Sequence, residues 1–132
     1  MVKIPDPGKT LFRASTYIYL IILTYMLLKP RMPEGGLTGS IPGTVLHTGA
    51  FLVLGFLVHM GWKKERTWTR IKAGSYTFMI AIILETLQLI VPGRSFSLID
   101  IGSNLLGLFL GVVAALLIIT ITEKEEKEPS PE

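Results

Sequence analysis

The sequence contains no cysteine. Disulfide bonds, thiolate metal sites and a cysteine nucleophile are therefore excluded. Charged residues are also scarce, at 17% of 132 residues, whereas 49% of the residues are hydrophobic. A nucleic-acid-binding domain would need a basic face on a soluble scaffold, but here the lysines and arginines lie beside apolar segments. We therefore expect membrane lipids with an anionic surface as partners, and no nucleic acid.

Motifs that mark well-known active sites are missing as well. The chain has no HExxH helix, no phosphate-binding glycine loop and no GxSxG turn. We therefore predict no metal site and no cofactor. A hydrolase built from Ser95 or Ser97 with His47 and Asp100 is disfavoured, because nothing marks either serine as a nucleophile.

Long apolar segments are what the sequence has instead. Crossing a bilayer takes about 20 apolar residues, and four segments approach that length, at residues 11–28, 45–62, 73–91 and 98–121. Lipid offers no hydrogen-bond partner to an open strand edge, so each segment is expected to be a helix. The sequence predicts an all-α integral membrane four-helix bundle, as one domain over residues 1–122. The charged residues 123–132 are expected to form a disordered tail.

Basic residues are distributed unevenly between the two ends of these segments. One end has Lys29, Arg31 and Arg94, and the other end has all the rest: Lys3, Lys9, Arg13, Lys63, Lys64, Arg66, Arg70, Lys72, Lys124 and Lys127. Because loops rich in lysine and arginine stay inside the cell, we predict a multi-pass protein of the cell membrane with both termini cytoplasmic. The basic start of the first span also fits a signal peptide, but its tyrosines and the lack of a clear cleavage site favour a retained span.

Polar side chains gather where the second, third and fourth spans approach the outer side. Glu85 and Gln88 are three residues apart and share one helix face, and Asp100 and Asn104, four apart, share another. Helices that pack as a bundle would bring this outer cluster together. We expect it to form an outward-facing polar pocket from six residues: His47, Glu85, Gln88, Arg94, Asp100 and Asn104.

The residue types leave several roles open within this cluster. Glu85, which is costly to place in the apolar zone, either pairs with Arg94 or His47, or is partly protonated and exchanges protons with a substrate. His47 can also be a polar anchor at the interface. Ser97, three residues before Asp100, resembles the start of a capping box with Asp in place of the usual Glu or Gln, so Asp100 can simply cap a helix. Arg94 suits a phosphate or carboxylate, and can equally pair with Asp100.

Small residues recur every four positions along the fourth span, at Ser103, Gly107, Gly111 and Ala115. Such a stripe lets two helix backbones approach closely. It predicts tight packing within the bundle, or association through the fourth span into a homo-oligomer or a membrane complex.

Two segments, HTGAFLVLGF at 47–56 and ETLQLIVPGRSFSLIDIGSNLLGLFLG at 85–111, resemble the VanZ-like membrane protein family. The shared pattern is a His that opens one span, then E-x-x-Q, a Pro-Gly-Arg turn, a Ser, and D-x-x-x-N-x-x-G-x-x-x-G. The resemblance implies a small polytopic protein of the bacterial cell envelope, in a family named after a protein associated with low-level resistance to the lipoglycopeptide teicoplanin. Its motif positions correspond here to His47, Glu85, Gln88, Arg94, Asp100 and Asn104.

Three functions remain compatible with these residues. The outer cluster can bind an envelope lipid headgroup or lipid-linked precursor, or shield it from a lipoglycopeptide, with Gln88, Arg94 and Asn104 as ligands. It can be the site of a membrane-embedded enzyme, with Glu85 and His47 as acid and base on a lipid-linked substrate. It can also hold helices together in a structural subunit of a membrane complex.

Overall fold

A computed structural model describes residues 7–30 and 42–125 of the chain. The described elements are four long helices, α1 (Pro7–Leu28), α2 (Gly43–Trp62), α3 (Thr67–Leu87) and α4 (Leu98–Glu125), and a short 3₁₀ turn, η1 (Gln88–Ile90), that continues α3. Residues 31–41, which lie between the first two apolar segments, and residues 126–132 of the expected tail lie outside the described residues.

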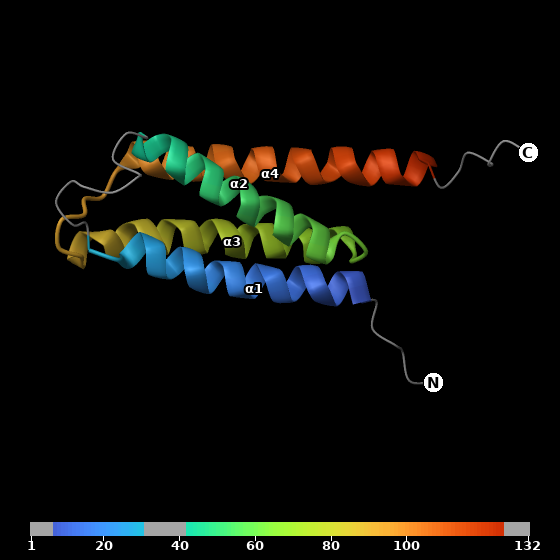
Figure 1. Cartoon of the computed structure of the whole chain (residues 1–132), viewed down its shortest axis with the longest axis horizontal. Coiled ribbons are helices and arrows are strands. Elements are labelled where there is room, and N and C mark those ends of the chain that lie inside the picture. The colour runs from blue at the N-terminus through green and yellow to red at the C-terminus, as the bar shows by residue number, and fades with distance from the viewer. Residues whose placement is uncertain (1–6, 31–41, 126–132) are drawn as a thin grey trace, which may run out of the picture.

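Successive helices run in opposite directions, so the beginning of α1 and the end of α4 lie at one end of the bundle (Figure 1). All four helices are long and apolar enough to cross a membrane. The expectation of an all-α chain with four spans is therefore confirmed. Three helices begin earlier than the apolar segments do, α1 at Pro7, α2 at Gly43 and α3 at Thr67, because a helix can continue through residues beyond the apolar zone.

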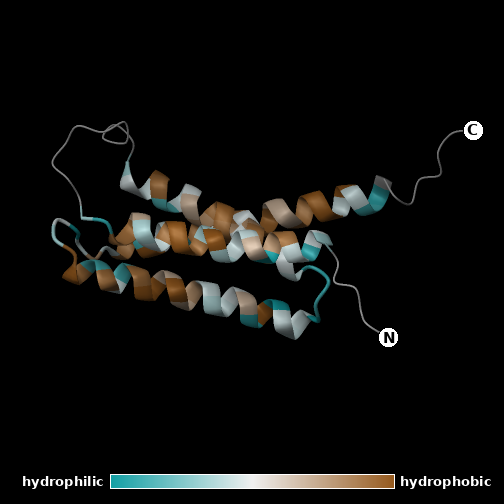
Figure 2. Cartoon of the chain, turned by 60° about the horizontal axis from the view of Figure 1, so that its bottom comes forward, coloured by the Kyte–Doolittle hydropathy of each residue, from teal (hydrophilic) through white to brown (hydrophobic). Residues whose placement is uncertain are grey.

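Hydrophobic residues predominate along much of the helices, and hydrophilic residues gather mainly toward the helix ends (Figure 2). Large hydrophobic side chains on different helices are exposed, for example Ile21, Met79 and Leu117. In a water-soluble protein such faces would be buried in a core. Here they fit contact with lipid tails, whereas Phe51 and Leu54 fill the interior with no exposure.

Helices α2 and α4 cross in backbone contact at their glycines. A Cβ atom at Gly111 would meet the main-chain oxygen of Leu52 and lie 2.6 Å from the nitrogen of Phe56. A Cβ at Gly55 would lie 2.5 Å from the main-chain oxygen of Leu108. Only glycine allows this approach, which is how small-residue stripes bring membrane helices together.

At the end where α1 begins, polar contacts join α1 to the turn between α2 and α3. Arg13 donates to the Glu65 carboxylate over 2.7 Å and to the carbonyl of Gly61 over 3.1 Å, and its guanidinium lies 4.8 Å above the Trp62 ring. Lys9 forms a second ion pair with Glu65. The hydrogen bonds from Lys9 and then from Arg13 hold the pKa of Glu65 below its ordinary value.

Candidate functional site

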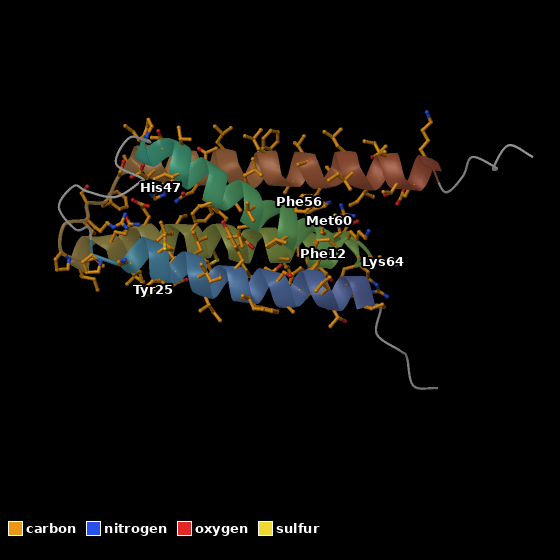
Figure 3. All side chains as sticks on the ribbon, viewed as in Figure 1. Phe12, Tyr25, His47, Phe56, Met60 and Lys64 are labelled. Atoms are coloured by element: carbon orange, nitrogen blue, oxygen red, sulfur yellow. The ribbon has the colours of Figure 1, made fainter. Side chains whose placement is uncertain are left out.

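A buried polar cluster lies at the opposite end of the bundle, where α2 and α4 begin (Figure 3). His47 of α2 is 7% exposed and Asn104 of α4 is 1% exposed. The Nδ1 atom of His47 lies 2.9 Å from Oδ1 of Asn104. Because a carboxamide oxygen can only accept, Nδ1 carries the proton in this contact. This hydrogen bond joins α2 to α4.

The second nitrogen of the His47 ring points at Asp100, one turn before Asn104 on α4. Nε2 of His47 lies 3.9 Å from Oδ2 of Asp100, which is too long for a hydrogen bond but suits an ion pair when the ring is protonated. The ring therefore lies between an amide oxygen of Asn104 and a carboxylate oxygen of Asp100.

The first turn of α4 connects this pair to α3. The main-chain amide of Asp100 donates to the hydroxyl of Ser97 over 3.3 Å, so Ser97 caps the helix as the sequence predicted. The amide of Ser97 in turn donates to Oε1 of Glu85 over 3.3 Å. In a standard capping box the third helical residue would accept this bond; here the acceptor comes from α3. Glu85 is thereby linked to the start of α4.

Two polar atoms in the cluster are left without partners. Glu85 is 1% exposed and Gln88, one turn further along, is 2% exposed. Oε2 of Glu85 and Nε2 of Gln88 are buried and have no hydrogen bond to any residue that the structure describes. An unsatisfied buried polar atom costs about 1–3 kcal/mol, so the pair is the most unusual feature of the cluster.

Arg94 lies beside the end of α1. Its Nη2 donates to the carbonyl of Met26 over 3.0 Å and its Nε donates to the carbonyl of Lys29 over 3.3 Å. A cation at a helix C-terminus is favourable because the last carbonyls have no partner within the helix. Arg94 is also within electrostatic range of Glu85, as are His47 and Asp100. Its proposed binding of a phosphate or carboxylate stays a prediction.

Three of the four small residues that recur on α4 are buried, and Ser103 is half-buried. Gly107 and Gly111 face α2 in backbone contact, and Ala115 is fully buried. The hydroxyl of Ser103 bonds back to the carbonyl of Ile99 over 2.9 Å on an exposed face. Packing within the bundle therefore accounts for the two glycines, while association of α4 with another protein stays a prediction.

The structure places the six predicted residues at one end of the bundle, but the sequence pattern did not indicate one connection there. It did not indicate the amide of Ser97 as a donor to Glu85, because that contact depends on how the Pro92–Gly93 turn folds α4 back along α3. Gly93 adopts a positive φ of 75°, the only such residue among those described. A glycine between two helical patterns is the signal that such a turn leaves in a sequence.

The chemistry available in the cluster is proton exchange and hydrogen bonding. It offers one imidazole, two carboxyls and two carboxamides within three helices. In the part of the chain that the structure describes, no three His, Cys, Asp or Glu side chains gather closely enough to hold a metal ion.

Comparison with known proteins yields one match. The profile of the VanZ/LLP1 family matches residues 12–119, which include all four helices in whole or in large part. No curated protein and no solved structure matches the chain. Because the match extends over most of the sequence and four helices can each cross a membrane, the chain is a polytopic membrane protein that belongs to the VanZ/LLP1 family.

Proposed function

We propose that the outer cluster binds the polar headgroup of an envelope lipid or of a lipid-linked precursor. The cluster lies at one end of helices that are suited to crossing a bilayer, which is the depth at which headgroups occur. Headgroups of this kind carry phosphates and hydroxyls, which form hydrogen bonds with carboxyl and amide groups.

The observation that carries the proposal is the unpartnered pair, Oε2 of Glu85 and Nε2 of Gln88. One atom is an acceptor and the other a donor, and they lie on one face of the helix one turn apart. A headgroup with a hydroxyl and a phosphate or carbonyl oxygen would satisfy both. A cluster that only joined helices would gain nothing from leaving these two atoms without partners.

The basic residues support an outward position for the cluster. Of the described lysines and arginines, only Lys29 and Arg94 lie at the cluster end, whereas the opposite end has Lys9, Arg13, Lys63, Lys64, Arg66, Arg70, Lys72 and Lys124. The positive-inside rule then directs the cluster to the outer leaflet and both termini to the cytoplasm. A lipid precursor held there would be less accessible to a lipoglycopeptide, which gives the proposed route to low-level teicoplanin resistance.

Drug susceptibility in a glycopeptide-sensitive Gram-positive host tests this proposal. At matched membrane levels, the wild-type chain is expected to protect against teicoplanin but not vancomycin. Glu85→Gln and Gln88→Leu should both lose that protection. Thr86→Val is the matched control, because Thr86 is an exposed neighbour whose hydroxyl bonds to the carbonyl of Ile82 within the same helix. Protection that survives in Gln88→Leu would contradict the proposal.

A second candidate function is acid–base catalysis on a lipid-linked substrate, with His47 and Glu85 as the acid and base. The observation in its favour is the position of the His47 ring, whose Nδ1 contacts the amide oxygen of Asn104 and whose Nε2 faces the carboxylate of Asp100. An enzyme would change the amounts of lipid substrates and products in living cells. Envelope lipid profiles that are identical with wild type and with Glu85→Gln would eliminate this candidate.

A further inference from the structure

A second site lies toward the opposite end of the bundle. A cavity of about 430 Å³ is formed between α2, α3 and α4, and no residue of the outer cluster lines it. Helix α2 leaves α4 and crosses toward α1 and α3 (Figures 1 and 2), so α3 and α4 are not packed tightly along this stretch. Most of the wall is apolar: Val58, Ile71, Phe78, Leu108, Phe109 and Val112.

The cavity has one cationic end. His59 of α2 and Arg70 of α3 both line it, and Arg70 acts electrostatically on His59. Nε2 of His59 and Nε of Arg70 are buried, and neither forms a hydrogen bond to any part of the chain that the structure describes. Among the residues that the structure describes, no Asp or Glu lines the cavity. The Arg70 guanidinium therefore meets no carboxylate in these walls, and both buried nitrogen atoms lack a hydrogen-bond partner there.

Gly74 leaves room beside these groups. A Cβ atom built on Gly74 meets nothing within 4 Å, although Gly74 is one of the lining residues. A ligand that satisfies the whole cavity must therefore carry an anion at one end and hydrocarbon at the other.

We propose that this cavity binds one anionic glycerophospholipid, with its phosphate at Arg70 and His59 and an acyl chain along the apolar wall. Its volume is within the range of about 300–1,000 Å³ that is usual for small-molecule sites. Phosphate oxygens accept the charge-assisted hydrogen bonds that a guanidinium donates. The basic residues that flank α2 and α3 at this end also favour anionic headgroups, as expected for basic pockets between membrane helices. The site is independent of the proposed function, because it uses other residues at the other end of the bundle.

Native mass spectrometry of the full chain in detergent, titrated with phosphatidylglycerol or phosphatidylcholine, tests the assignment. The wild type should retain phosphatidylglycerol in preference to phosphatidylcholine. Arg70→Gln should weaken retention about tenfold, as expected for loss of a charge-assisted hydrogen bond, whereas Arg66→Gln, an exposed charge outside the cavity, should not. Gly74→Leu should fill the cavity and prevent binding with every charge intact. Gly49→Leu is its control, because Gly49 also has open space around its Cβ position but lies outside the cavity.

Each alternative occupant gives a different result. Equal retention of the two lipids by the wild type would overturn the proposal. So would equal losses in Arg70→Gln and Arg66→Gln, which would mean attraction by surface charge alone. Retention that is unchanged in Gly74→Leu would show that the acyl chain lies elsewhere. A lipid-free dimer that Gly74→Leu dissociates would make a second copy of the chain the occupant.

Discussion

Replacement of Gly107 by alanine tests the contact between α2 and α4 with a single methyl group. In the wild type the Cβ position of Gly107 lies 2.9 Å from the nitrogen of Leu52, 3.0 Å from Cβ of Phe51, and against the carbonyl oxygen of Thr48. Two of these three contacts are with backbone, which cannot rotate away as a side chain can. The helices would have to separate by several tenths of an ångström to admit the methyl group.

Gly102→Ala is the matched control, because a Cβ atom at Gly102 on the same helix meets nothing within 4 Å. Any intrinsic gain from replacing glycine by alanine, up to about 1 kcal/mol in a helix, is common to both variants. The difference between them therefore isolates the overpacking cost, which is typically about 1–3 kcal/mol. We expect Gly107→Ala to be less stable than Gly102→Ala by that amount.

Unfolding in mixed micelles with a rising fraction of SDS, followed by tryptophan fluorescence, measures this difference. Trp62 is a suitable reporter because it contacts both Tyr17 and Arg13 of α1. Gly107 lies one turn after Asn104, so separation of the helices should also weaken the hydrogen bond to His47. Equal unfolding midpoints for Gly107→Ala and Gly102→Ala would refute the close contact of α2 and α4.

Three further predictions concern the ends of the helices. The pKa of Glu65 is lowered in the fold, so its contribution to stability is present at neutral pH and is lost as pH falls below the ordinary glutamate pKa of about 4.5. In a plot of stability against pH, Glu65→Gln should therefore reduce the loss of stability on the acid side. An unchanged acid side would contradict this prediction. Arg94→Gln should lower stability by about 1–3 kcal/mol, because it removes a cation that donates hydrogen bonds to carbonyls at the end of α1. Unfolding in SDS measures this difference, and a variant as stable as the wild type would disprove the capping role. Because the chain has no cysteine, single substitutions can report its orientation. In intact cells, Ser95→Cys should react with a membrane-impermeant thiol reagent and Thr67→Cys should not. The reverse pattern would invert the proposed orientation.

The sequence predicted the apolar spans well because the bilayer imposes a length on each of them. It predicted helix ends less well. The segment before Ala73 is polar and basic, yet α3 already begins at Thr67, and α4 continues past the apolar zone to Glu125. Hydropathy indicates which part of a helix contacts lipid. The helix itself continues for as long as its backbone hydrogen bonds do, which can be beyond the apolar zone.

The candidate site was also predictable only in part from the sequence. Spacing alone placed Asp100 and Asn104 on one face and indicated Ser97 as a cap. The partner of each side chain was not predictable, because it depends on how each helix is rotated against its neighbours. His47 reaches Asn104 only because Gly107 allows α2 and α4 to touch.

If the unpartnered atoms of Glu85 and Gln88 are ligands for a headgroup, a lipid should stay bound to them during purification, and identifying that lipid is the most direct test of the proposed function. The chain would be purified from envelope membranes in mild detergent, and its retained lipids identified and counted by mass spectrometry. One envelope lipid or lipid-linked precursor, distinct from the glycerophospholipid proposed for the cavity at Arg70, is expected on the wild type and on Thr86→Val, and its loss is expected in Gln88→Leu without loss of fold. Retention of that same lipid by a folded Gln88→Leu variant, or of no such lipid by the wild type, would contradict the proposed role of Glu85 and Gln88.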